Sequence, residues 1–417
     1  MKKERNRKGR WQAFWKGLQV NANLYASFFL SLVGIGSLVA NAIEKKDIAV
    51  ALLVSIVSIV FSVVSLLTQI IRYKKEQSLI YAVEDQHYKD KLQEKIKANI
   101  SLLDGGYAYQ SFGQQAYIVS EEVDRYLQKN ATAIALLPSE SQYRLPQELN
   151  TFIPFALRKR LDSGRKFYNS KKIRLCDDLT PKTMAVHLQK TDYFSVFCSN
   201  DLSYRKLRSR KSLSNRFNGG DILLDDNDCL STLEDSVMAN NIGVSTLAIT
   251  TDGYAIVSLQ GDLNNVGAGR FAPSGSGSQD YADAKNCKNL AAVLINGMNR
   301  ELREECHLPR EALLRTEVVG YIRIVERGGK PDFFGLTRIP YTKEQVESWI
   351  PHNPEIRQGL MQKPSFILYQ DPDQFEKDVG DLCASTKRQM SLQLHCLLSI
   401  LKRDRGLFFP REDLPRE

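Results

Sequence analysis

Several common signals are absent from this sequence of 417 residues. Its seven cysteines include no CxxC pair, and no group of cysteine and histidine has the spacing of a zinc site. Zinc domains of the usual kinds need such groups, so the spacing excludes them. The cysteines are therefore expected to be reduced thiols, most of them small residues of a core.

Charge is missing from two long stretches near the N-terminus. Residues 24–43 and 48–71 contain no charged side chain, and each is long enough to cross roughly 30 Å of hydrocarbon as a helix. Basic residues precede them in 1–23 and follow them at once. The positive-inside rule then predicts a transmembrane hairpin at 24–71, in a multi-pass protein whose two termini are cytoplasmic.

Small and polar side chains form a stripe on the second stretch. They recur at steps of three and four residues, as Ser55, Ser58, Ser62 and Ser65. Such a stripe lets membrane helices pack closely and form hydrogen bonds. It would pack against the first stretch of the same chain, mediate assembly between chains, or line a polar path after assembly.

Glycine and proline are absent from Arg72 to about Leu103, where lysine, glutamate and glutamine are frequent. This composition indicates a helical connector over 72–106, which Asp104, Gly105 and Gly106 end. A rigid rod that transmits motion and an inert spacer are both consistent with it.

Residues 107–235 mix helix and strand signals and predict an α+β segment. Ser120 before two glutamates marks a helix start. Residues 182–188 favour a helix, and residues 191–198 favour a strand.

Two basic runs, at 158–174 and 205–216, contribute to the net charge of +9. Aromatic residues lie among them, and such a mixture could bind anionic lipid or nucleotide phosphates. A solvated surface is the alternative. Nothing in either run indicates base readout of a duplex.

Residues 236–417 predict an α/β domain. The expected order is a hairpin with its turn at Thr251-Asp252-Gly253, a helix, two strands and a last helix. Their ranges are 243–260, 284–306, 316–326, 330–339 and 385–402.

Three carboxylates share one face of the expected helix at 284–306, because Glu301, Glu304 and Glu305 are three or four residues apart. Mg²⁺ takes carboxylate oxygens together with substrate phosphates. A solvated acidic face, with Arg300 and Arg303 interleaved, is the alternative.

This stretch resembles the helical half of the Nudix box, Arg-Glu-U-x-Glu-Glu-x-Gly-U, where U is bulky and aliphatic. The matching residues are Arg300, Glu301, Leu302, Glu304, Glu305 and Leu308. The family pattern has Glu where this chain has Ala292, and Gly where it has Asn286 and His307. Asp280 or Asp283 could supply the displaced acidic residue.

The resemblance implies an α/β/α Nudix-like sandwich that seats a nucleotide between the box helix and neighbouring strands. Metal ligands would be Glu301, Glu304 and Glu305, and the cofactor would be Mg²⁺. Stacking platforms would be Phe271, Phe333 and Phe334, with core packing as the alternative for each. Phosphate partners would be Arg270, Arg300, Arg323 and Arg338.

The full order of segments resembles the two-transmembrane NUDIX effectors of CBASS anti-phage systems. The fold class expected is a membrane α-helical hairpin, then an α+β segment, then a cytosolic Nudix-like sandwich. This resemblance implies a protein of the cell inner membrane that binds a cyclic oligonucleotide made by a partner nucleotidyltransferase. It would then form a homo-oligomer and disrupt the lipid bilayer, killing the infected cell.

Two other functions remain open. One is a membrane-anchored, Mg²⁺-dependent hydrolase of nucleoside diphosphate derivatives, in which Glu304 would be catalytic. The other is a membrane scaffold with an inert Nudix fold.

Overall fold

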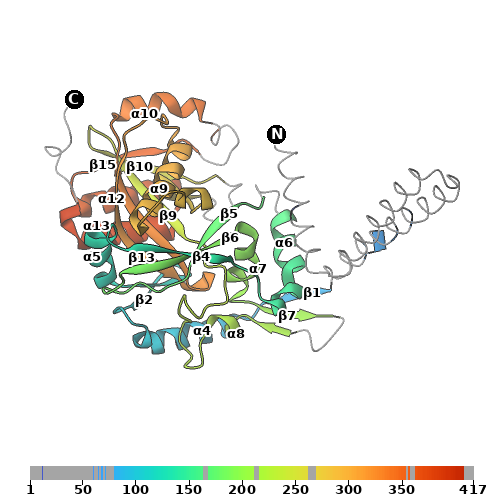
Figure 1. Cartoon of the computed structure of the whole chain (residues 1–417). Helices are drawn as coiled ribbons and strands as arrows, with labels where there is room; N and C mark the ends of the chain where they lie inside the picture. The colour runs from blue at the N-terminus through green and yellow to red at the C-terminus, as the bar shows by residue number, and fades with distance from the viewer. Residues whose placement is uncertain are drawn as a thin grey trace, which may run out of the picture.

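A computed structural model describes most of the chain beyond residue 78. The described residues are 79–162, 168–210, 216–261, 269–353 and 362–407, with Gln12, Val60, Val64, Leu67, Thr68, Ile71 and Ile356 in addition. Figure 1 shows that their centre is a large twisted sheet with helices around it.

The large sheet has ten strands, most of them antiparallel to their neighbours. In spatial order they are β16 (Gln389–Met390), β11 (Arg270–Pro273), β10 (Tyr254–Leu259), β9 (Gly243–Ile249), β14 (Lys330–Arg338), β13 (Arg315–Ile324), β3 (Gln115–Val119) and β2 (Ala108–Phe112), while β12 (Gly275–Ser278) pairs with β9 and β15 (Ser365–Leu368) with β10. The hairpin expected before the box helix and the two strands expected after it are all present.

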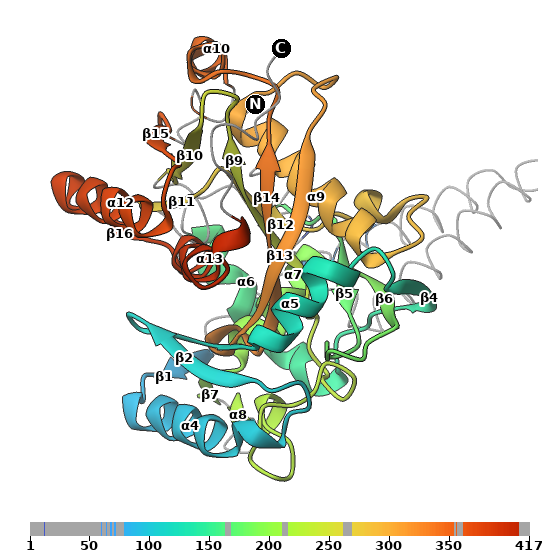
Figure 2. The same ribbon diagram turned by 90° about the vertical axis from the view of Figure 1, so that its left-hand side faces the viewer.

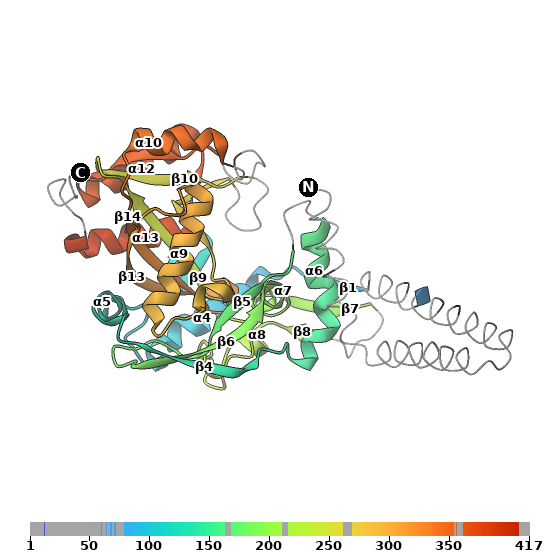
Figure 3. The same cartoon turned by 45° about the horizontal axis from the view of Figure 1, so that its top comes forward.

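Two smaller sheets have three strands each. One contains β1 (Ile80–Val83), β7 (Lys206–Ser209) and β8 (Arg216–Asn218), and the other β4 (Ala135–Gln142), β6 (Ala185–Asp192) and β5 (Lys171–Leu175). Isolated bridges join the second small sheet to the start of the box helix, at Ala135–Asn289, and to the turn before that helix, at Lys172–Asp280. Figure 3 shows β5 and β6 close to that helix.

The helices cover the sheets. They are α4 (Gln86–Asn99), α5 (Glu121–Asn130), α6 (Ile153–Asp162), α7 (Tyr193–Cys198), α8 (Gly220–Leu223), α9 (Leu290–Cys306), α10 (Lys343–Trp349), α12 (Pro372–Thr386) and α13 (Leu392–Arg403), with short 3₁₀ turns that include η4 (Tyr281–Ala284) and η5 (Val325–Arg327). Ser120 caps α5, as expected, because its side chain accepts from the N–H of Val123.

The box helix α9 forms because its apolar residues recur every four positions. Leu290, Leu294, Met298, Leu302 and Cys306 form one stripe, and all five are buried. The side chain of Asn289 caps its first turn by accepting from the N–H of Ala292 at 2.9 Å. Arg300, Arg303 and Glu304 are therefore left on the other face.

Helices lie on both faces of the large sheet. Figure 2 shows α9 on one side of β13 and β14, and α12 and α13 on the other. Leu294 and Met298 of α9 share a core with Phe333, whereas Leu397 and Ile400 of α13 share one with Phe334. The described chain is thus an α/β fold.

The large sheet continues into the segment expected to be separate. β3 pairs with β13 through Ile322, Arg323 and Ile324, so strands from 107–235 extend the sheet of 236–417. The described part of 72–106 is not one helix. It holds β1 and then α4, whose Leu92 and Ile96 are buried in the same core as α9.

Two local expectations are wrong. Residues 185–192 form strand β6 instead of a helix, and residues 193–198 form helix α7 instead of a strand. The side chain of Asp192 explains the second difference, because it accepts from the N–H of Ser195 and so starts the helix.

The expectation of a membrane hairpin is also wrong, and with it the expectation of a multi-pass protein in the inner membrane. Among the described residues, no helix is both long enough and apolar enough to cross a membrane. The box helix α9 has 17 residues and a charged face, whereas a span needs about 20 apolar residues. The stretches 24–43 and 48–71, including the serines at 55, 58, 62 and 65, lie outside the described residues, apart from the few named above.

Candidate functional site

The turns on either side of α9 adopt the backbone that the Nudix pattern assigns to glycine. Asn286 precedes the helix with φ 64°, and His307 ends it with φ 55°. Glycine takes this left-handed conformation without strain, while other residues take it uncommonly. Both positions where the resembled pattern has glycine therefore hold a left-handed backbone with a side chain added.

Arg300 is the centre of a polar network beneath this helix. Its Nε lies 3.1 Å from Asp283 Oδ1, and its Nη2 lies 3.0 Å from Asp283 Oδ2 and 3.1 Å from the Ser278 carbonyl oxygen. Its Nη1 lies 2.7 Å from Glu301 Oε1. These carboxylates raise the pKa of the guanidinium, although burial opposes them. Asp283 is therefore closer to Arg300 of the box helix than Asp280, whose Oδ2 lies 3.8 Å from Nε.

Glu301 is enclosed between the helix and β12. Its side chain is 13% exposed, and burial raises its pKa, against the opposing charges of Arg300 and Lys172. A Cβ added at Gly277 would come 2.1 Å from Glu301 Oε1, so a larger residue at that position would displace the carboxylate.

The other two box carboxylates point elsewhere. The side chain of Glu304 is 55% exposed and lies 3.9 Å from Arg300 Nη1. Glu305 is buried, and the amide of Asn353 donates to its backbone carbonyl at 2.6 Å. Within the described ranges, no three side chains of His, Cys, Asp or Glu are gathered as a group that could hold a metal.

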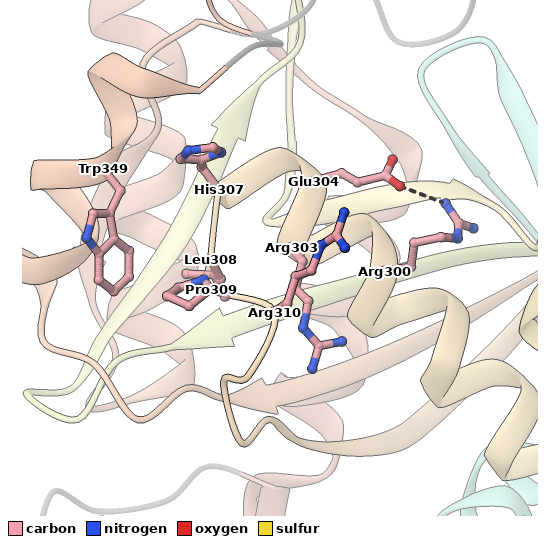
Figure 4. A pocket seen from close by; sticks show the side chains of 8 residues that line it. All are labelled: Arg300, Arg303, Glu304, His307, Leu308, Pro309, Arg310 and Trp349. Carbon is pink, nitrogen blue, oxygen red and sulfur yellow. Dashed lines mark ion pairs between the residues drawn. The ribbon is translucent and has the colours of Figure 1, made fainter.

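A cavity of about 610 Å³ opens over the C-terminal half of α9. It is lined by Arg300, Arg303, Glu304, His307, Leu308, Pro309, Arg310 and Trp349. Figure 4 shows Trp349 at one end, the Arg300–Glu304 pair at the other, and the guanidinium groups of Arg303 and Arg310 between them. We call this cavity the arginine pocket.

Two cations of the arginine pocket have no acidic partner in the described part of the chain. Arg303 donates from Nη2 to the Ala312 carbonyl oxygen at 3.1 Å, but its Nε is buried without an acceptor there. Arg310 is exposed and forms no ion pair with a described residue. The pocket wall therefore carries two guanidinium groups whose charge no described carboxylate neutralises.

Trp349 gives the pocket an aromatic wall. It ends α10, is half-buried, and packs edge-on against Tyr341 with ring centroids 4.7 Å apart. An indole in such a place combines an apolar surface with an N–H donor.

The residues expected to bind a nucleotide are mostly elsewhere, and of these only Arg300 lines the arginine pocket. The rings of Phe271, Phe333 and Phe334 are at most 2% exposed and belong to the cores on the two faces of the sheet, so the alternative of core packing describes them.

The remaining arginines of that set hold other parts of the fold. Arg323 is 1% exposed and pairs with Asp178 at 2.8 Å. Arg270 donates to the side chain of Gln115 at 3.2 Å. Arg338 ends β14, opposite Arg315 of β13.

Sequence reasoning missed Arg310, His307 and Trp349 as site residues. Arg303 had a signal, since it stands inside the box. The others come from the loop after α9 and from α10, and no local pattern brings them together.

Comparison with known proteins adds little. No protein-family model matches the chain, and no curated protein matches it. Among solved structures, one that is similar is the crystal structure of Tm1382, a protein assigned to the Nudix hydrolases. Its identity to this chain is 12%, the match covers 39% of this chain and 70% of that one, and the TM-score is 0.25. A likeness this distant carries no argument about ligand or activity.

Proposed function

We propose that the arginine pocket binds a nucleotide through its phosphates. The observation that carries this proposal is that Arg303 and Arg310 both line the pocket and have no acidic partner in the described part of the chain. The planar guanidinium group presents several N–H donors that match phosphate oxygens.

The balance of charge favours a ligand with about two negative charges. Arg300 is already neutralised by Asp283 and Glu301. Arg303 and Arg310 leave two positive charges in the pocket wall, while Glu304 at the far end pairs with Arg300. A ligand with two phosphate groups between the arginines and a planar ring against Trp349 would complement this arrangement.

The finer proposal is that the ligand is a cyclic oligonucleotide, as the CBASS resemblance implies. Its phosphodiesters and bases supply the two kinds of group that the pocket favours. The volume of about 610 Å³ lies within the usual range of roughly 300–1,000 Å³ for ligand pockets. Hydrolysis of a nucleoside diphosphate derivative is the second candidate, and the exposed carboxylate of Glu304 in the pocket wall favours it.

Magnesium fits this site only together with a ligand. Glu301 faces Arg300 and Glu305 is buried, so Glu304 is the one box carboxylate that is exposed. Mg²⁺ often binds one or two carboxylates and completes its shell with water and substrate phosphates. Bound in that way, it would polarise a phosphate that the arginines hold.

Calorimetric titration of the full chain tests the proposal. The ligands are inorganic pyrophosphate, a cyclic dinucleotide, a cyclic trinucleotide and a nucleoside diphosphate sugar, each with and without Mg²⁺. Arg303→Ala and Arg310→Ala should each weaken binding about tenfold or more, since a charge-assisted hydrogen bond contributes about 1.5–3 kcal/mol. The matched control is Arg405→Ala, an exposed arginine outside the pocket.

The outcomes separate the candidates. Binding without turnover supports a sensor. Turnover with Mg²⁺ that Glu304→Gln abolishes supports the hydrolase. Failure to bind any of the four ligands, or binding that neither arginine variant weakens, would overturn the proposal.

A further inference from the structure

Lys172 and Arg300 share two acceptors beneath the arginine pocket. Lys172 Nζ lies 3.0 Å from the Ser278 carbonyl oxygen, and Arg300 Nη2 lies 3.1 Å from the same atom. Lys172 Nζ also lies 2.5 Å from Asp280 Oδ1, while Arg300 Nε lies 3.8 Å from Asp280 Oδ2. Two cations from separate segments therefore share one carbonyl and one carboxylate, with Lys172 much the nearer of the two to the carboxylate.

Lys172 is held firmly in this place. It belongs to β5, its side chain is 10% exposed, and its backbone forms a bridge with Asp280. Asp280 is the less buried of the two, at 34%, and it caps η4, where its own N–H bonds Asp283 Oδ2 at 2.8 Å. Lys172 lies closer to Asp280 than Arg300 does. Arg300 instead pairs with Asp283 and Glu301 and lines the pocket.

We propose that Lys172 is a positioning residue for the arginine pocket: by holding Asp280, it leaves Arg300 on Asp283 and Glu301, in the place from which Arg300 lines the pocket. The inference rests on the proposed function. Without the ammonium, Asp280 would be an uncompensated carboxylate near a guanidinium, and Arg300 would shift toward it and out of the pocket wall, which would weaken the binding of a phosphate there. The same coupling makes ligand binding strengthen the contact of β5 with η4, because coupling between two sites is reciprocal.

Two substitutions with opposite expected effects test this inference. Lys172→Met removes the charge at similar length, and affinity for inorganic pyrophosphate should fall about fivefold or more, the usual lower range of such couplings. Asp280→Asn keeps a capping side chain but removes the competing charge, so affinity should rise. The double variant should return to within about twofold of the wild type.

The opposite signs exclude a merely structural role. Both single variants break the same ion pair, so both should lower the melting temperature, and a shared loss of stability cannot shift affinity in two directions. Affinity shifts in the same direction, or no shift in either variant, overturn the inference about Lys172. The proposed function still holds in that case if Arg310→Ala weakens binding. If the wild-type chain binds no pyrophosphate and none of the nucleotides, the proposed function and this inference both fail.

Discussion

Arg300 and Asp283 face each other as a two-pronged ion pair, with Nε 3.1 Å from Oδ1 and Nη2 3.0 Å from Oδ2. The pair joins the box helix to the turn before it. The Nudix pattern has its acidic residue within the helix, where this chain has Ala292. Asp283 provides a carboxylate from η4 instead, so the arginine keeps a partner although the spacing differs.

Replacing Asp283 with alanine should destabilise the fold by about 2–4 kcal/mol, because a largely buried guanidinium loses its two-pronged partner. The carboxylate is 7% exposed and the guanidinium 23%. Chemical denaturation measures the change. The control is Asp226→Ala, at an exposed position, which should change stability by less than about 0.5 kcal/mol. Equal effects of the two substitutions would contradict this role of Asp283.

Replacing His307 with glycine should stabilise the chain by about 0.5–1 kcal/mol, since glycine adopts a φ of 55° without strain. Lys387 ends α12 with φ 52°, and Lys387→Gly should behave alike. Melting temperatures of both variants check the expectation. Loss of stability in His307→Gly alone would show that the imidazole makes contacts that outweigh the backbone strain.

Stability should fall as pH rises toward 7, through the titration of Glu326. Burial raises its pKa from 4.5 to about 7, although its Oε1 accepts from the N–H of Ala116 and from Gln93. The folded chain then binds this proton more tightly than the unfolded chain. The stability that this proton contributes is complete below pH 4.5 and is lost as pH rises to about 7.

The variant Glu326→Gln isolates this effect. Asp124 is also buried, with its pKa raised to about 6, so only the difference between wild type and variant belongs to Glu326. That difference should change by about 1–3 kcal/mol between pH 4.5 and pH 8. Urea denaturation at several pH values measures it, and parallel stability profiles would show that Glu326 ionises freely.

Replacing Arg323 with methionine should destabilise the fold by about 3–5 kcal/mol without lowering the affinity for pyrophosphate. Its guanidinium is buried, pairs with Asp178 at 2.8 Å, and donates to the carbonyls of Gly329 and Ser231. It thereby joins β13 to Asp178 and Ser231 of the segment 107–235. The control is Arg125→Met, since that side chain is 56% exposed. If the variant keeps its stability but loses pyrophosphate binding, Arg323 is a ligand-binding residue and not a structural one.

Local patterns along the chain predicted several elements well. Apolar residues at every fourth position predict the helix α9. Apolar strand segments with turn residues between them predict the hairpin of β9 and β10 and the strands β13 and β14. The short segment of α7 was not predictable in this way, because the capping contact of Asp192 outweighed its strand-like composition.

The roles of single aromatic and charged residues were harder to predict. Phe333 and Arg323 stand in strands whose two faces are both covered, so their burial depends on helices far away in sequence. From the sequence, a core phenylalanine and a stacking platform look alike, as do a buried structural arginine and a phosphate ligand.

The sequence by itself determined the box helix, its carboxylates and its left-handed end, because the interactions that form them lie within a few residues. Tertiary structure alone decided which of those side chains line the arginine pocket. It placed Asp283 on Arg300, put Lys172 of β5 beside them, and gathered Arg303, Arg310 and Trp349 around one cavity. These contacts depend on the packing of α9 against distant segments, and sequence spacing does not encode that packing directly.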